Sequence, residues 1–309
     1  FMNTARVGTA LQGVCSAELA YQNSLIYAKE RLSMRSLTGK KYPEQVADPI
    51  IVHPDVRKML MTQKAISEGG RAMIYYTAKI VDEIEMAKTE EEKQAADDRL
   101  GFITPILKAF LTELGSESAN HGLQIFGGHG YIKEWGMEQI VRDARIATLY
   151  EGTTGIQGLD LLGRKILKTR GAAIAPLMDM FGDFVAENRW NSHARKFNKY
   201  RKKWKSLTRS VGFKVMKGGM DDLNGAAVEY LMFAGYVTLG YFWSRAAIIA
   251  QEQIDKGEGN IEFYKAKVEM ANFYYDRIMP RTEALTEIIG NGKDTLMAMD
   301  EERFIFLDV

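Results

Sequence analysis

The sequence predicts an all-α protein, in which a long antiparallel helical bundle is followed by an additional helical region. Apolar residues recur at steps of three and four over long stretches, the spacing of one helix face. No stretch of the first 170 residues alternates with period two for long enough to be a convincing strand. The 309 residues include only six prolines, and three of them fall within twelve residues, at 43, 49 and 54. Long segments on either side therefore lack the residue that most strongly interrupts helices.

The bundle is expected to contain three long helices and one shorter helix. The first carries the apolar stripe Val7, Leu11, Val14, Tyr21, Leu25 and Ala28. The proline cluster marks Ser36–Pro54 as a loop, and the second helix follows over Val56–Ala87. The acidic stretch Thr89–Asp98 is interpreted as a solvated connection. The third stripe contains Leu107, Leu111, Leu114, His121 and Ile125, and the shorter fourth contains Ile156, Leu159, Gly163 and Ile166.

A domain boundary is expected at Gly171–Pro176, which divides the chain into residues 1–170 and residues 171–309. Three further helical patterns follow, over about Leu177–Leu207, Asp221–Lys256 and Ile261–Ile289. The tail Glu301–Val309 is apolar enough at its end to be expected to dock on another surface.

Composition excludes several classes of protein. A net charge of +1 provides no global basic field for nucleic acid. The single cysteine, Cys15, allows no internal disulfide, so a reducing compartment, the cytoplasm, is expected. Cys15 itself is expected to be a small core residue. The chain start lacks the pattern of a signal peptide. The longest uncharged run, Tyr230–Ser244, is shorter than the ~20 residues that span a bilayer.

The sequence contains no motif for a metal site or for a catalytic nucleophile. None of the four histidines follows a glutamate at the spacing of a di-iron site, and Glu117 with His121 stands alone. One cysteine cannot form a structural zinc site. The chain also lacks a serine nucleophile elbow, a phosphate-binding P-loop and a dinucleotide-binding glycine motif after a strand. No metal is therefore expected.

The segment His193–Lys205 carries seven Lys or Arg residues. Phe197, Tyr200 and Trp204 lie within it at steps of three and four, and thus share one helical face. The favoured interpretation is an aromatic core stripe with a solvated basic back. The alternative is a contact for anionic lipid or another acidic partner.

Two motifs could carry chemistry. Tyr150–Thr154 places the carboxylate of Glu151 in a turn between two apolar-periodic segments, and Gln124–Tyr131 contains three glycines in four residues. Glycines let a backbone approach a bulky ligand closely. Taken singly, the glycine loop could equally be a helix C-cap. Glu151 could equally be a carboxylate near a helix that Thr153 or Thr154 caps.

In order, spacing and identity, Gln124–Tyr131, Arg142–Ile146 and Tyr150–Gln157 together resemble the C-terminal helical domain of the acyl-CoA dehydrogenases. The resemblance covers about residues 1–170. The region after 171 is similar to the larger bacterial branch that includes the 3-methylthiopropanoyl-CoA dehydrogenases. In that family a helical N-terminal domain and a β-domain precede this part, so the sequence resembles the C-terminal half of the family's chain.

The resemblance implies FAD-dependent α,β-dehydrogenation of acyl-CoA thioesters to 2-enoyl-CoA. Glu151 occupies the place of the catalytic base, which removes the α-proton while the flavin takes hydride from the β-carbon. Its backbone N–H is implied to bind the thioester carbonyl. Arg6 matches an arginine near the CoA arm, and Gly152 belongs to the same substrate-binding turn. Some relatives carry the base on the first helix, but Ala5 stands there and cannot act.

The resemblance also implies the FAD contacts. Arg31 matches the arginine at the flavin pyrophosphate. Gln124, Gly127 and Gly128 match the loop against the adenosine half, which comes from a neighbouring subunit. Thr153 and Gly155 match the turn over the phosphates, although Gly155 replaces a polar residue.

Two further departures affect flanking contacts. Leu32–Arg35 lacks the family's aromatic residue, and His53-Pro54 lacks its glutamine.

The implied partners are an acyl-CoA substrate, further copies of the chain in a homodimer or homotetramer, and an electron-transfer flavoprotein. A mutase or oxidase on the same fold would differ in its electron acceptor. The competing hypothesis is a non-catalytic helical oligomerisation or interaction module. Without the β-domain, the isolated chain is expected to bind FAD weakly and to be inactive.

Overall fold

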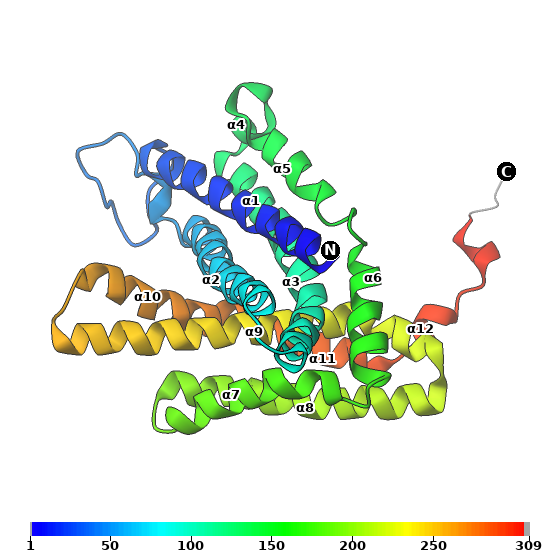
Figure 1. Cartoon of the computed structure of the whole chain (residues 1–309). Coiled ribbons are helices and arrows are strands. Elements are labelled where there is room, and N and C mark those ends of the chain that lie inside the picture. Colours follow the sequence, from blue (N-terminus) through cyan, green and yellow to red (C-terminus); the bar gives the residue numbers. More distant parts are fainter. Residues whose placement is uncertain (1, 306–309) are drawn as a thin grey trace.

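The computed structural model describes residues 2–305, which are helical almost throughout (Figure 1). Within this range no β-strand forms, and a single isolated bridge pairs Leu32 with Pro49. The α-helices are α1 Met2–Glu30, α2 Pro54–Glu85, α3 Glu90–Phe126, α4 Gly128–Tyr131, α5 Met137–Ile146, α6 Thr154–Leu159, α7 Ala175–Glu187, α8 Ser192–Gly218, α9 Met220–Lys256, α10 Ile261–Phe273, α11 Arg281–Asn291 and α12 Asp294–Met297. The predicted all-α fold is confirmed.

Short 3₁₀ and π turns link the α-helices. They are η1 Ile50–Val52, η2 Lys133–Trp135, η3 Asp160–Leu167, η4 Ala172–Ile174, η5 Tyr274–Ile278 and η6 Glu301–Phe304. The predicted loop Ser36–Pro54 is confirmed apart from η1 and the first residue of α2.

Within the bundle formed by α1, α2 and α3, the backbones of α1 and α3 approach each other closely at one point. A Cβ added to Gly13 of α1 would lie 2.3 Å from the Leu111 carbonyl oxygen of α3, and one added to Gly115 would lie 2.4 Å from the Gly13 oxygen. The two backbones touch because neither glycine has a side chain. This contact fixes the N-terminal half of α1 against the middle of α3.

The predicted connection over Thr89–Asp98 is wrong, because most of it is the start of α3. Thr89 caps the helix, and its Oγ1 accepts a hydrogen bond from the Glu92 N–H at 3.1 Å. Acidic residues 90–92 occupy the first turn, where the helix dipole favours negative charge. These turns project into solvent, so their composition resembles that of a loop.

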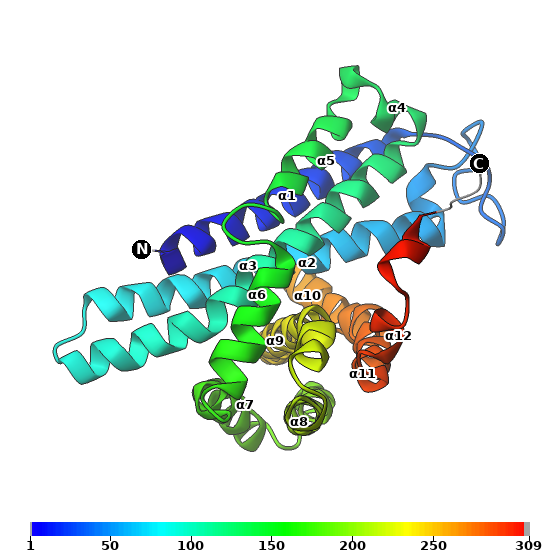
Figure 2. The same ribbon diagram turned by 90° about the vertical axis from the view of Figure 1, so that its right-hand side faces the viewer.

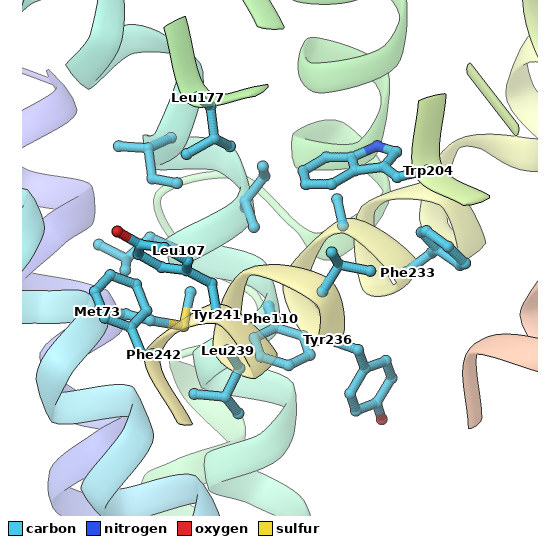
Figure 3. Close-up of a cluster of buried hydrophobic side chains, with 14 of the residues drawn as sticks. Met73, Leu107, Phe110, Leu177, Trp204, Phe233, Tyr236, Leu239, Tyr241 and Phe242 are labelled. Atoms are coloured by element: carbon cyan, nitrogen blue, oxygen red, sulfur yellow. The ribbon is translucent and has the colours of Figure 1, made fainter. Parts of the chain in front are cut away.

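Helix α9 is the centre of the molecule. The uncharged run Tyr230–Ser244 is buried except for Met232, as expected for a helix that is apolar all round. Figure 2 views α9 nearly end-on, among the helices α6, α8, α10 and α11 that pack against it. Across the α3–α9 contact, the rings of Phe110 and Tyr236 meet edge to face at 5.0 Å (Figure 3). No helix within residues 2–305 is long and apolar enough to cross a membrane.

One hydrophobic core runs from α1 to α11 across residue 170. The division of the chain into residues 1–170 and 171–309 stays a prediction. The pattern predicted over Leu177–Leu207 is two helices, α7 and α8, separated near Asn188–Asn191. The Asn191 side chain ends the break by capping α8.

The aromatic stripe of α8 is part of the core. Phe197, Tyr200 and Trp204 are all buried, and the Trp204 indole N–H donates to the Tyr230 hydroxyl at 2.8 Å. The interpretation as a core stripe with a basic outer face is confirmed.

One prediction about an apolar position is wrong. Cys15 is exposed rather than buried, on a face of α1 where Leu11 and Leu19 are also exposed. This face lies away from α3, so the apolar stripe of α1 is wider than the contact it makes. In the tail, Phe304 and Ile305 are exposed, and residues 306–309 lie outside the described residues, so docking of the tail stays a prediction.

Candidate active site

The Glu151 turn joins the segment after α5 to α6 and has an unusual backbone. Glu151 has φ 59° and Gly152 has φ 94°, so two successive residues are left-handed. Glycine is required at 152, since an added Cβ would also lie 2.6 Å from Nε2 of Gln157. A glutamate in this conformation costs about 1–3 kcal/mol, so surrounding contacts must stabilise it. Thr153 then caps α6, accepting from the Ile156 N–H, which confirms the predicted capping role.

Three donors from three helices bind the two carbonyls of this turn. Nε2 of Gln157 donates to the Glu151 oxygen at 2.9 Å, and Nε of Arg6 donates to the same oxygen at 3.3 Å. Nζ of Lys108 donates to the Gly152 oxygen at 2.7 Å. The turn is therefore fixed by α6, α1 and α3 together.

The carboxyl group of Glu151 is available for chemistry. Its Oε2 is buried and has no hydrogen-bond partner within residues 2–305. A buried polar atom without a partner is costly and calls for an explanation. A carboxylate oxygen that has no partner can accept a hydrogen bond or a proton from a bound ligand. The arrangement therefore suits removal of a proton from a bound ligand.

Arg6 completes this end of the site. Its Nη1 lies 3.6 Å from Oδ2 of Asp160, and both side chains are mostly buried. The neighbouring Tyr150 hydroxyl donates to the Gln12 side chain. The first three turns of α1 thus line the Glu151 turn. Gly155 also lies here, and a Cβ added to it would meet nothing within 4 Å.

The glycine loop has a different character. Gly127, with φ 59°, ends α3, and its N–H bonds to the Gln124 carbonyl at 3.0 Å, so the C-cap interpretation is confirmed. Gly127, Gly128 and Gln124 are exposed. A Cβ on either glycine would meet nothing within 4 Å, so this chain alone does not require glycine there for lack of space.

An aromatic cluster supports the glycine loop, and no sequence motif predicted it. Tyr27 of α1 stacks on Phe126 at 4.1 Å, and the His129 ring stacks on Trp135 at 5.1 Å. The Tyr27 hydroxyl lies 2.9 Å from Nδ1 of His129, which joins the two stacks. Tyr27 belonged to no motif. It contacts residues about 100 positions later in the sequence because the fold places them side by side.

The two groups of predicted site residues lie at opposite ends of α1. Arg31 follows α1 directly, and Arg6 lies 25 residues earlier, about 37 Å away at the helical rise of 1.5 Å per residue. In Figure 2 the N-terminus of α1 lies at the left, and α4 lies near the C-terminal end of α1. Glu151, Gly152, Thr153, Gly155 and Arg6 are therefore together, whereas Arg31 joins Gln124, Gly127 and Gly128.

The departures from the family pattern have local structural roles. Met34 is left-handed, with φ 63°, and exposed. Nε2 of His53 lies 3.0 Å from the Ser33 carbonyl oxygen, so the histidine contacts the loop that follows α1. Among residues 2–305, no three His, Cys, Asp or Glu side chains are grouped as metal ligands.

Comparisons with known proteins agree with this fold along the chain. Residues 1–167 match the family model described as acyl-CoA dehydrogenase, C-terminal domain, and residues 177–300 match the one described as acetyl-CoA dehydrogenase C-terminal like. The chain is 35% identical to 3-methylmercaptopropionyl-CoA dehydrogenase of Ruegeria pomeroyi, over 96% of this chain and 50% of that protein. It is 30% identical to broad-specificity linear acyl-CoA dehydrogenase FadE5 of Mycobacterium tuberculosis, over 97% and 51%.

Solved structures share the fold at lower identity. An acyl-CoA dehydrogenase from Bacillus anthracis complexed with FAD has a TM-score of 0.68 at 21% identity, over 98% of this chain and 50% of that one. Caenorhabditis elegans ACDH-11 in complex with C11-CoA has a TM-score of 0.70 at 17% identity, over 96% and 46%. The chain spans about half the length of the curated relatives it matches. By its sequence match over both halves, the chain belongs to the acyl-CoA dehydrogenase family.

Proposed function

We propose that the intact protein catalyses FAD-dependent α,β-dehydrogenation of acyl-CoA thioesters to 2-enoyl-CoA, with Glu151 as the base. The observation that carries this proposal is the buried, unpartnered Oε2 of Glu151 on a turn fixed by three donors. A structural carboxylate would be expected to use its oxygen atoms in hydrogen bonds or an ion pair.

Different groups of the turn would take part in proton removal. The α-carbon–hydrogen bond of the thioester breaks and the proton passes to the Glu151 carboxylate. The backbone N–H of Glu151 has no acceptor within residues 2–305, so it is free to bind the thioester carbonyl and stabilise charge that develops there. Arg6, beside the turn, would face the CoA portion. Bound FAD would supply the acceptor for the β-hydrogen as hydride.

Residues at both ends of α1 fit a flavin dinucleotide. Gly127, Gly128 and Gly155 border open space that a side chain would fill. Arg31 offers a guanidinium for the pyrophosphate, Gln124 an amide for the adenosine half, and Thr153 a turn for the phosphates. Since the two ends lie about 37 Å apart in one chain, we propose that each flavin site combines the Glu151 end of one copy with the glycine loop of another. This requires a homodimer or a homotetramer.

The proposed substrate and electron acceptor are supported by the names of the relatives. Curated relatives are named for 3-methylmercaptopropionyl-CoA, linear acyl-CoA and butyryl-CoA, so a short or linear acyl-CoA is the proposed substrate class. Reduced flavin would pass its electrons to an electron-transfer flavoprotein, and a caffeyl-CoA reductase–Etf complex subunit is among the relatives. The cytoplasm is the proposed location.

The test is Glu151→Gln in the intact protein, assayed with a panel of acyl-CoA thioesters and an artificial electron acceptor. We expect FAD content to be retained and turnover to fall by ~10²–10⁴-fold, as for loss of a general base. Glu18→Gln, on a carboxylate of α1 that pairs with Arg71 and has no contact with the Glu151 turn, is the matched control and should lose far less. Near-normal turnover in Glu151→Gln would contradict the assignment and favour a non-catalytic helical module.

A further inference from the structure

Lys108 is a fully buried cation in the middle of α3. Its side chain is 0% exposed, among the largest side chains that the fold buries completely. It forms no ion pair with any carboxylate of residues 2–305, and its one hydrogen bond is the 2.7 Å contact from Nζ to the Gly152 oxygen. Burying an unpaired ammonium is unfavourable, so its presence needs a reason other than stability.

The charges around Lys108 come from three elements. Glu113 lies on the same helix, Glu151 on the turn, and Arg6 on α1, where it pairs with Asp160. Burial lowers the pKa of Lys108 to about 8. Glu113 and Glu151 oppose this effect, whereas Arg6 adds to it. The ammonium is therefore present at neutral pH and is lost under mildly alkaline conditions.

The bond from Lys108 is the only one that residues 2–305 give to the Gly152 carbonyl. Arg6 and Gln157 both bind the preceding carbonyl, that of Glu151. Removal of Lys108 would leave the Gly152 oxygen without a donor, and rotation of this peptide would move both left-handed residues of the turn. The side chain of Glu151 would then point in a different direction.

We propose that Lys108 is a positioning residue, whose ammonium binds the Gly152 carbonyl and keeps Glu151 in the left-handed conformation that leaves its carboxyl group free. This proposal rests on the dehydrogenation assigned above and adds a role for a residue that does not touch the substrate. A charged donor makes a stronger hydrogen bond than a neutral amine does. The turn should therefore loosen, and turnover should decline, as the pH rises through about 8.

The experiment compares two variants of the intact, flavin-containing protein. Lys108→Met replaces the cation with an apolar side chain of similar length, which buried sites commonly tolerate. We expect FAD content to be unchanged and kcat to fall by ~10–100-fold, the scale of a small misplacement of a catalytic group, with a smaller change in KM. Exchange of the substrate α-hydrogen in D₂O, which follows the base independently of flavin reduction, should fall in parallel.

Lys108→Arg is the rescue variant, because arginine keeps its charge at every accessible pH. It should restore most of the turnover at pH 7 and abolish the decline above pH 8. It also carries the test if Lys108→Met does not fold. Thr104→Val is the matched control, since Thr104 is buried on the same helix and donates only to the Leu100 carbonyl of its own turn. It should keep the wild-type rate and pH profile.

Three outcomes distinguish failure of this proposal from failure of the proposed function. If Glu151→Gln loses turnover but both Lys108 variants keep the wild-type rate and alkaline decline, Lys108 has no positioning role and the proposed function stands. Loss of turnover in Lys108→Met and Thr104→Val alike would also overturn the proposal, because it would show general damage to α3. If Glu151→Gln itself keeps turnover, the proposed function fails first.

Discussion

The two ends of α1 differ in what a single chain supplies. At the N-terminal end, three donors from α1, α3 and α6 fix the Glu151 turn, and Lys108 and Gln157 among them are buried. At the other end, the glycine loop rests on an aromatic cluster, and Gly127 and Gly128 face open space. At the N-terminal end, contacts within the chain stabilise the left-handed conformation of the Glu151 turn. At the other end, the glycine loop presents an open surface on which a ligand or a second copy of the chain could bind.

This difference indicates which parts of the site are preorganised. The proposed base, Glu151, must be held within a small tolerance of the proton that it removes, and internal bonds to the turn supply this support. The proposed cofactor surface at the glycine loop needs shape and open backbone groups, and a bound cofactor would complete the contacts. Substitutions at the turn should therefore change rates, whereas substitutions at the loop should change cofactor affinity.

The largest effect is expected at the turn, from Gly152→Ala. The added Cβ would lie 2.6 Å from Nε2 of Gln157, at a φ of 94° that alanine rarely adopts. The turn must shift, and turnover in the intact protein should fall by ~10²-fold. Steady-state kinetics and flavin absorbance measure this. Wild-type kinetics in this variant would show that the turn needs no defined geometry.

A smaller effect is expected between the two ends, at Glu117 on α3. Arg281 of α11 binds its carboxylate with two bonds, at 2.6 and 2.8 Å. Burial would raise the pKa of Glu117, but hydrogen bonds from His121 and Arg281 and the charge of Arg281 lower it to about 2. This pair stabilises the fold above the ordinary glutamate pKa of 4.5, and the contribution is lost as pH falls towards 2.

Glu117→Gln should therefore lower the free energy of unfolding by about 2 kcal/mol at pH 7, the scale of hydrogen bonds to a charged group. The loss should shrink as the pH falls from 4.5 towards 2. Denaturation of the intact protein across this range measures it, with Glu287→Gln, exposed on α11, as the control. An equal loss at every pH would exclude the ion pair as its source.

At the loop, Gly128→Val should leave the fold intact and weaken FAD binding by about tenfold, or 1.4 kcal/mol. The new side chain has open space in the chain itself, so it would compete only with a bound ligand. Gly290→Val is the matched control, since that glycine also borders open space and lies on α11. Equal FAD affinity in the two variants would place the cofactor elsewhere.

Periodicity predicted most of the fold, but not which helix would be central. In the sequence, the run Tyr230–Ser244 is recognisable only as a segment without charged residues. Helix α9 is central because six other α-helices pack around it, and the sequence does not show this packing. Helix ends were less predictable where they are polar, because Thr89 and the acidic residues after it suit a cap and a loop equally. Cys15 was misplaced because an apolar stripe does not reveal how wide its contact is.

The Glu151 motif was visible because its residues are adjacent in sequence. The donors that hold it were not, since Lys108 lies 44 residues before the carbonyl it binds. One signal was present, because Lys108 is the only charged residue in the apolar run Ile106–Leu111. A lone cation in a buried stripe needs a partner, but the sequence could not show that the partner is a backbone oxygen.

The central claim, that each site combines opposite ends of two copies, is tested most directly by complementation. Glu151→Gln and Gly128→Val chains of the intact protein are mixed by co-expression, after each variant alone has been shown to have little activity at limiting FAD. In a mixed pair, one site would carry both defects and the other neither. With half of the pairs mixed, about a quarter of the wild-type activity should return. Activity no higher than the average of the two variants would contradict the claim, because it would mean that Glu151 and Gly128 serve the same flavin from within one chain.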